Sequence, residues 1–351
     1  MPQKVFIMGG GVLARRLFVK LFEDSYGDTI VGIGDVYGQF ADAPTMAKQF
    51  YYNLKYDTIY GRSFSKNHSL NYSDNDSYIV VDGMKIDFYV ETNPIDIIFG
   101  NLGGPVVIDC SGVADDGTLW NAAYLGGATS IIVTTRPDST TLQNYYNNKI
   151  VVPPINDTPH GIACCIPNGD VIAMSVISKI VNDNTTLNYV YATVQKANTN
   201  FGYVQDFPDG SASNDARAAD NIIYKGFSNA PVGYVIPELQ GKVVPCIYRV
   251  NNKNANTIFF NFLAQQSQTK SSVEIMFKSA TGDISKYIDC NYDSIASSDY
   301  SDVKSIGVMI NHDYLSVQNQ NFQLNVHYDF ICLHVRAITD YLYNHNGDFG
   351  F

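Results

Sequence analysis

Three consecutive glycines, Gly9 to Gly11, are the feature that most limits how this chain can fold. They follow a short β-type run, Lys4–Ile7, and precede a segment, Val12–Phe22, whose apolar residues recur at helical spacing. A second β-type run, Thr29–Gly34, ends at the acidic residue Asp35. This order of strand, glycine turn, helix, strand and acidic residue is typical of a dinucleotide-binding fold built on a parallel sheet.

The spacing Gly9-x-Gly11-x-x-Ala14 predicts a role for each position. Glycine permits the tight turn and lets the backbone approach a pyrophosphate, which rests on the N-terminus of the helix. The carboxylate of Asp35 would accept hydrogen bonds from the hydroxyls of the adenosine ribose. Because its charge also repels the additional phosphate of NADP, we expect NAD as the cofactor. The alternative interpretation is an ordinary turn at Gly10 and Gly11 with no nucleotide.

The two halves of the chain carry different kinds of β-type sequence. Short runs separated by polar loops in the first half predict a mostly parallel sheet, whereas longer runs in the second half predict an antiparallel one. We therefore expect an α/β fold with a Rossmann-type dinucleotide-binding domain and an α+β domain with a mostly antiparallel sheet. The runs are Tyr78–Val81, Lys85–Val90, Val106–Cys110 and Ser130–Thr134, then Leu187–Val194, Gly241–Val250, Thr257–Leu263 and Ser305–Ile310.

Length and charge exclude several classes of protein. A chain of 351 residues suits two domains, and its net charge of -11 opposes binding to the nucleic-acid backbone. No apolar run approaches the ~20 residues that a membrane span needs. Because Met1–Met8 leads directly into the glycine cluster, it leaves no room for a secretion signal, and we expect a cytoplasmic protein.

The six cysteines include one adjacent pair, Cys164 and Cys165. Their number and irregular spacing favour reduced thiols over a disulfide framework. No C-x-x-C pair occurs, and the six histidines are scattered singly, so we expect no metal site.

Several segments match a known family in the same order along the chain. Val235–Lys242 reads V-I-P-E-L-Q-G-K, which differs by one residue from V-I-P-E-L-N-G-K. Tyr56–Arg62 is similar to Y-D-S-T-H-G-K, Asn93–Gly100 to D-P-x-x-I-x-W-G, and Val107–Val113 to V-x-E-S-T-G-V. From Lys4 to about Leu342 the chain resembles glyceraldehyde-3-phosphate dehydrogenase.

The resemblance implies a domain organisation and an assembly. Residues 1–163 would form the NAD-binding domain, completed by a C-terminal helix at 331–351, and residues 164–330 would form the catalytic-type domain. The loop Asn200–Asp215 takes the position of the family's interface loop, which implies a homotetramer.

Cys165 stands where the family has its catalytic cysteine, because Ala163–Asn168 occupies the place of A-S-C-T-T-N. The apolar residues that follow have helical spacing, so we expect the thiol at a helix N-terminus, where the dipole favours the thiolate, with Pro167 in the first turn. In the segment that resembles T-T-V-H-A-I-T-A-T, Gln195 replaces the catalytic histidine. An amide takes up no proton near neutral pH, and losing a positioned base costs ~10²- to 10⁴-fold in rate.

Other positions implied by the resemblance divide into changed and retained residues. Asn198 and Asn200 replace the paired threonines that hold substrate phosphate, and Phe330 begins the segment that replaces the nicotinamide-binding N-E-F-G-Y. Arg249 is retained at a phosphate-contacting arginine, and Arg217 also survives.

Three functions are compatible with this pattern. The preferred hypothesis is a family member with lost or strongly weakened catalysis that acts as a structural or regulatory homo-oligomer. The alternative is an active NAD-dependent phosphorylating aldehyde dehydrogenase that uses Cys165, with water or another base in place of histidine. A third is a sensor that binds NAD without reacting it. His160 is a further candidate base, although we expect it to point elsewhere.

Overall fold

The computed structural model describes residues 3–57, 60–112, 118–134, 150–157, 163–197, 223–226, 231–250, 252, 255–293, 296–300 and 307–345. The chain divides into two compact units. The first comprises Met1–Val151, Asp157–Pro167 and Val335–Phe351, and the second comprises Val152–Asn156 and Asn168–His334.

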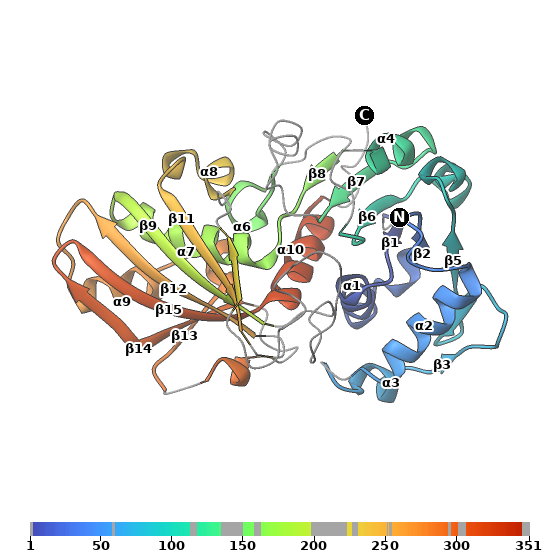
Figure 1. The fold of residues 1–351 in the computed structure, drawn as a ribbon, viewed down its shortest axis with the longest axis horizontal. Coiled ribbons are helices and arrows are strands. Elements are labelled where there is room, and N and C mark those ends of the chain that lie inside the picture. The colour runs from blue at the N-terminus through green and yellow to red at the C-terminus, as the bar shows by residue number, and fades with distance from the viewer. Residues whose placement is uncertain are drawn as a thin grey trace. The chain divides into compact units, whose positions relative to one another are not determined.

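The first unit is built on an eight-stranded sheet in the described residues, with strand order β3-β4-β5-β2-β1-β6-β7-β8 (Figure 1). The pairs from β5 through β8 are parallel, and β3, β4 and β5 pair antiparallel. The elements are β1 Val5–Met8, α1 Val12–Glu23, β2 Ile30–Asp35, α2 Ala43–Lys55, α3 Ser63–Asn67, β3 Leu70–Asn71, β4 Tyr78–Val81, β5 Met84–Val90, β6 Val106–Asp109, α4 Thr118–Leu125, β7 Ser130–Val133 and β8 Ala163–Cys165.

The core of this unit follows from its apolar strands and two amphipathic helices. All four residues of β1 are buried, as a strand in the middle of a parallel sheet requires. Phe18 of α1 and Phe50 of α2 meet edge to face with ring centroids 5.4 Å apart, and both are buried. The predicted strand, glycine turn, helix and strand at the N-terminus are therefore confirmed.

The second unit contains a seven-stranded sheet in the described residues, with order β10-β11-β9-β12-β15-β14-β13. Its pairs are antiparallel except β11 with β9 and β13 with β14, which confirms the expected mostly antiparallel sheet. The elements are α6 Pro153–Asn156, α7 Gly169–Asn184, β9 Leu187–Lys196, β10 Ile223–Gly226, α8 Val232–Val235, β11 Val243–Arg249, β12 Ala255–Ala264, α9 Lys270–Lys278, β13 Ile288–Asn291, β14 Val308–Gln318, β15 Asn321–Asp329 and α10 Phe330–Asn344.

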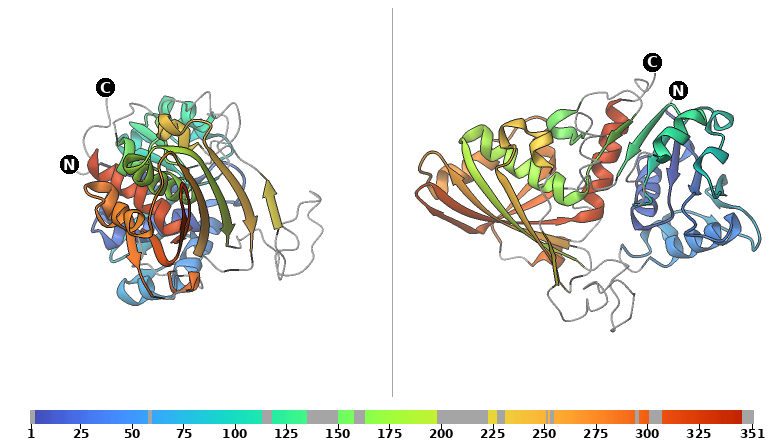
Figure 2. Two further views of the ribbon diagram at one scale, coloured as in Figure 1. Left: turned by 90° about the vertical axis from the view of Figure 1, so that its left-hand side faces the viewer. Right: turned by 45° about the horizontal axis from the view of Figure 1, so that its top comes forward.

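The two faces of this second sheet differ in burial. Figure 2 shows α7 and α9 on one face, where Val190, Ala192 and Val194 of β9 are buried. The alternate residues Tyr189 and Tyr191 point to the other face and are 47% and 52% exposed. Because side chains alternate along a strand, this pattern assigns every residue of β9 to a face.

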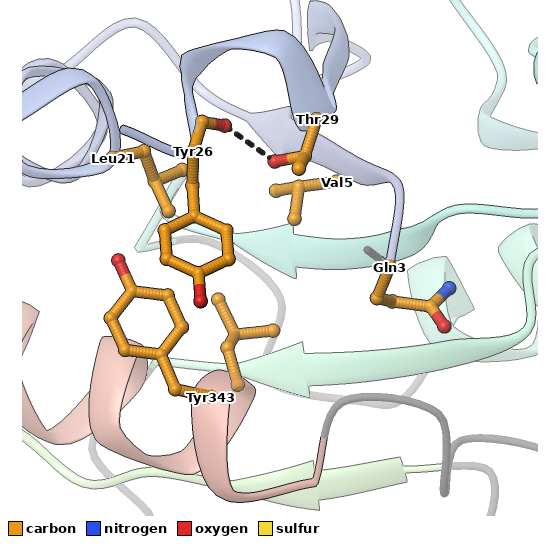
Figure 3. Close-up of a pocket in the computed structure, with 7 residues that line it drawn as sticks. Gln3, Val5, Leu21, Tyr26, Thr29 and Tyr343 are labelled. Carbon is orange, nitrogen blue, oxygen red and sulfur yellow. Dashed lines mark hydrogen bonds between the residues drawn. The ribbon is translucent and has the colours of Figure 1, made fainter. Parts of the chain in front are cut away.

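The division between the units falls within α10, whose residues from Val335 onward belong to the first unit. Near its end Tyr343 stacks on Tyr26, with centroids 4.4 Å apart, and its hydroxyl donates to Asp24 Oδ2 at 2.8 Å. A small pocket lined mainly by apolar side chains lies beside this stack (Figure 3), and it includes none of the predicted site residues. No helix in the described ranges is both long and apolar enough to span a bilayer.

Candidate active site and cofactor site

The glycine turn between β1 and α1 has the backbone geometry that a pyrophosphate site needs. Gly9 has a φ of 107°, and a Cβ there would lie 3.0 Å from backbone atoms of Cys110 and Ser111, so only glycine fits. Gly11 is the N-cap of α1, and a Cβ on it would meet no atom within 4 Å. In the described part of the chain, no side-chain cap hydrogen bond is made at Gly11, and Ala14 is buried. The turn therefore fits the phosphate groups of a dinucleotide.

Asp35 ends β2, as predicted, but its carboxylate accepts hydrogen bonds from backbone N–H groups of the residues that follow it. Its Oδ1 accepts the backbone N–H of Tyr37 at 3.1 Å, and its Oδ2 accepts that of Phe40 at 3.0 Å. The side chain is fully buried. The contact between Asp35 and a ribose stays a prediction.

Asp109 is a buried acid at this site that the sequence analysis did not single out. It ends β6 in register with Met8 of β1. Its Oδ1 accepts from the N–H and hydroxyl of Ser111 at 3.0 and 2.6 Å, whereas its Oδ2 is buried without a hydrogen-bond partner. Burial raises the pKa of Asp109 to about 6.

Cys165 ends β8 and is 1% exposed. The expectation that it lies at a helix N-terminus was wrong, because the chain stays extended beyond it and Ile166 N–H donates to Val133 at 3.0 Å. The helix begins only at Gly169, after Asn168, whose side chain accepts the N–H of Val171 at 3.3 Å. Pro167 therefore precedes the helix and does not lie in its first turn.

The environment of Cys165 disfavours a thiolate. Burial raises the pKa of the Cys165 thiol, and the neighbouring Cys164 adds to the shift. None of the six cysteines, all of which lie in the described ranges, forms a disulfide, and this includes the adjacent pair.

Gln195 lies near the end of β9 on the same face as the exposed Tyr191. It is in register with Tyr248 of β11 and with Thr257 of β12. Thr257 in turn is paired with His327 of β15, and its Oγ1 lies 2.9 Å from His327 Nδ1. Burial lowers the pKa of His327, which keeps the imidazole neutral at pH 7, and its Nε2 is buried without a partner.

Lys196, the next residue, points to the opposite face and joins a buried polar network. Its Nζ lies 2.5 Å from Oδ2 of Asp170, in the first turn of α7. Oδ1 of the same carboxylate accepts from Asn256 Nδ2 at 2.8 Å and from the Tyr328 hydroxyl at 2.7 Å. The ammonium also lies 4.7 Å from the centroid of the Phe330 ring. The network thus joins the N-terminus of α7 to three strands and to α10.

The remaining predicted site residues are only partly brought together. Arg249 is in register with Lys196, so it shares the face of Lys196 and not that of Gln195. His160, Asn198, Asn200 and Arg217 lie outside the described residues, as does the loop Asn200–Asp215.

The signal that would have identified Lys196 was present in the sequence. The alternation of Val190, Ala192 and Val194 continues to position 196 and places a lysine among buried residues. A lysine on a buried face requires a counter-charge, and Asp170 supplies it. Only the fold shows that Asp170 lies beside the end of β9.

Two family models match the chain. "Glyceraldehyde 3-phosphate dehydrogenase, NAD binding domain" covers residues 3–117, which include the glycine turn and Asp35. "Glyceraldehyde 3-phosphate dehydrogenase, C-terminal domain" covers residues 170–330, which include Gln195. The chain belongs to the glyceraldehyde-3-phosphate dehydrogenase family.

Relatives within the glyceraldehyde-3-phosphate dehydrogenase family have low sequence identity to this chain, but the similarity covers most of its length. The glyceraldehyde-3-phosphate dehydrogenase of Streptomyces coelicolor is 28% identical over 305 residues, 85% of each chain. That of Neurospora crassa is 27% identical over 308 residues, 85% of this chain and 84% of the relative. Glyceraldehyde-3-phosphate dehydrogenase B of Aspergillus oryzae is 26% identical over 330 residues, 90% and 92% of the two chains. Cys165 lies between the two ranges that the family models match.

Metal chemistry has no visible site in the parts of the chain that the structure describes. Within them no group of three or more His, Cys, Asp or Glu side chains is arranged to hold a metal ion.

Proposed function

We propose that this protein is a glyceraldehyde-3-phosphate dehydrogenase relative whose catalysis is lost or strongly weakened, and that it acts as a structural or regulatory homo-oligomer. The observation that carries the proposal is the state of Cys165, which is 1% exposed with a pKa raised by burial. A thiol must become a thiolate to attack an aldehyde, and burial opposes that step. Gln195, which takes the place of the family histidine in the resemblance, cannot accept the proton.

The polar network around Asp170 supports the same conclusion. Lys196 follows Gln195, and Phe330 takes the place of the asparagine that binds nicotinamide in the resemblance. In this chain the two side chains contact each other, and the lysine is neutralised by Asp170. Because Lys196 and Asp170 already pair with each other, neither is available to bind a substrate. Separating them is unfavourable, because it leaves a buried charge unpaired.

A weakened affinity for NAD is part of this proposal. The glycine turn is intact, but Phe330 offers no hydrogen bond to a carboxamide and Asp35 is occupied by backbone N–H groups. NAD, when bound, would supply the hydride acceptor. In this chain the residues around Gly11 would hold its phosphates.

A group of exposed aromatic side chains on the second sheet supports the proposed oligomeric role. Tyr189 and Tyr191 stack at 6.4 Å, and Phe259 of β12 lies diagonally across from Tyr191 on the same face with 38% exposure. Exposed aromatic side chains gathered on one face are typical of an interface between subunits. A homotetramer buries this face against other copies of the chain.

NADH formation from NAD, phosphate and glyceraldehyde 3-phosphate tests the proposal. Ordinary enzymes turn over at about 1–10³ per second, and we expect a rate at least ~10²-fold lower with saturating NAD. Cys165→Ser gives the background of the assay, and Cys164→Ser is the matched control. Ordinary turnover that disappears in Cys165→Ser and persists in Cys164→Ser would instead establish an active NAD-dependent phosphorylating aldehyde dehydrogenase.

A further inference from the structure

The segment Val36–Ala41, here called the strap, connects Asp35 at the end of β2 to the start of α2. Val36 is 5% exposed, which anchors one end, and Gly38 takes a φ of 69°, which turns the chain back. At the other end Asp42 caps α2 by accepting the N–H of Thr45 at 2.8 Å. The strap is therefore fixed at both ends and turns at a glycine.

The ring of Phe40 lies directly against the glycine turn. A Cβ on Gly10 would lie 2.7 Å from Phe40 Cζ, 2.9 Å from Phe40 Cε2 and 3.4 Å from Met46 Cε. These distances leave no room for even a methyl group between the ring and the backbone of Gly10. The neighbouring Gly11 is open, since a Cβ there meets nothing within 4 Å. One side of the turn is thus covered while the other is accessible.

The strap also engages the acidic residue of the dinucleotide site. Both oxygens of Asp35 accept N–H groups of the strap, from Tyr37 and Phe40, and the carboxylate is completely buried. In a dinucleotide fold the adenosine ribose lies between the glycine turn and this acid. The ring of Phe40 and the backbone of the strap therefore lie at both surfaces that the ribose has to contact.

We propose that the strap is an autoinhibitory contact that closes the adenosine half of the NAD site, with Phe40 as its closing residue. The inference rests on the NAD site of the proposed function and gives its weak affinity a structural cause. The pyrophosphate half at Gly11 stays open, whereas the ribose enters only after Phe40 leaves Gly10 and the strap releases Asp35. Apparent affinity for NAD then falls by the fraction of molecules in which the strap is open.

Calorimetric titration with NAD of three proteins tests the strap: the unmodified chain, Phe40→Ala and Gln39→Ala. Removing the Phe40 ring favours the open strap, so we expect Phe40→Ala to bind NAD at least about tenfold more tightly than the unmodified chain. Gln39→Ala removes an exposed side chain from the same strap and leaves affinity unchanged. Phe40→Leu, which retains an apolar side chain, gives an intermediate affinity and replaces Phe40→Ala should that variant fail to fold.

Hydrogen exchange on the unmodified chain provides a second test that needs no variant. Saturating NAD should speed exchange of the amides of Tyr37 and Phe40, because their bonds to Asp35 break when the ribose binds. Ligands normally slow exchange at their site, so this direction is specific to displacement of the strap.

Equal or weaker binding of NAD by Phe40→Ala, or slower exchange in the strap with NAD, would overturn the proposal. So would the absence of NAD binding in every variant, since the strap would then not be what limits the site. None of these results bears on the loss of catalysis, which is measured as turnover at saturating NAD.

Discussion

At the scale of residues, Lys196, the neighbour of Gln195 in β9, forms an ion pair with Asp170 of α7 inside the second unit. Asp170 is 3% exposed, and its carboxylate forms an ion pair with Lys196 and accepts hydrogen bonds from Asn256 and Tyr328. Its charge is therefore compensated by side chains of the second unit. Burial raises the pKa of Tyr328 well above its ordinary value, which keeps its hydroxyl as a donor. Such a network holds a conformation but offers no group that is free to exchange protons with a substrate.

Replacing Lys196 should therefore affect stability. Lys196→Met leaves the Asp170 carboxylate buried without its cation, and we expect it to lower the free energy of unfolding by about 3 kcal/mol. Urea denaturation followed by circular dichroism measures the change.

Lys179→Met is the matched control for this variant. Lys179 pairs with Asp183 four residues along the same helix, but the two side chains are 31% and 52% exposed. We expect a loss below about 0.5 kcal/mol. The double variant Asp170→Asn/Lys196→Met should recover part of the loss, and a loss for Lys196→Met no larger than that of the control contradicts the network.

Asp109 should make the first unit more stable in acid. Because its folded pKa of about 6 lies above the ordinary 3.8, its contribution is complete below about pH 4 and is lost as the pH rises through 6. The difference corresponds to roughly 3 kcal/mol. Urea midpoints between pH 4.5 and 7 should fall less steeply for Asp109→Asn than for the unmodified chain. Parallel pH profiles would show that Asp109 titrates normally.

At the scale of elements, the start of α7 is held against the start of α10. A Cβ on Gly169 would clash with the backbone oxygen of Phe330. Asp329, just before α10, caps that helix by accepting the N–H groups of Ile331 and Cys332 at 3.0 and 2.9 Å. The two helix ends are thus packed backbone to backbone.

Gly169→Ala should separate these two ends. The methyl group meets a carbonyl that its helix fixes, and we expect a destabilisation of about 2 kcal/mol. Gly100→Ala is the control, because its Cβ would meet its nearest atom at 3.7 Å, an ordinary contact, and we expect a change within about 0.5 kcal/mol. The midpoints of thermal unfolding of the two variants test this prediction. Equal midpoints would show that a methyl group at position 169 fits between the two helix ends, and would contradict the prediction.

The sequence predicted the elements better than it predicted their junctions. Apolar periodicity located β1, α1, β2 and most of the longer strands, because burial dictates those patterns. It failed at Cys165, since nothing in Ala163–Asn168 shows that the ladder to β7 continues through Ile166 before the helix begins. Asp170 and Lys196 are 26 positions apart in the chain, and only the register between strands and helix brings them together.

At the scale of the whole molecule, the exposed aromatic face of the second sheet should control assembly. Tyr191→Glu places a charge at the centre of this face beside Tyr189 and Phe259. We expect the proposed homotetramer to dissociate to smaller species, since an unpaired charge buried in an interface is unfavourable. Sedimentation velocity measures the change, with Ile275→Glu as the control, because Ile275 is 57% exposed and belongs to α9 on the opposite face of the sheet. An unmodified chain that sediments as a monomer would contradict the oligomeric role.

The reactivity of Cys165 tests the central claim most directly. Alkylation by iodoacetamide between pH 6 and 10, followed by mass spectrometry of the peptide that contains Cys165, reports how readily its thiolate forms. A buried thiol with a raised pKa should react more slowly at pH 7 than the partly exposed Cys246, and should show no rate plateau below about pH 8.5. Rapid, selective labelling of Cys165 at pH 7, with a plateau near neutrality, would show an activated nucleophile and contradict the account.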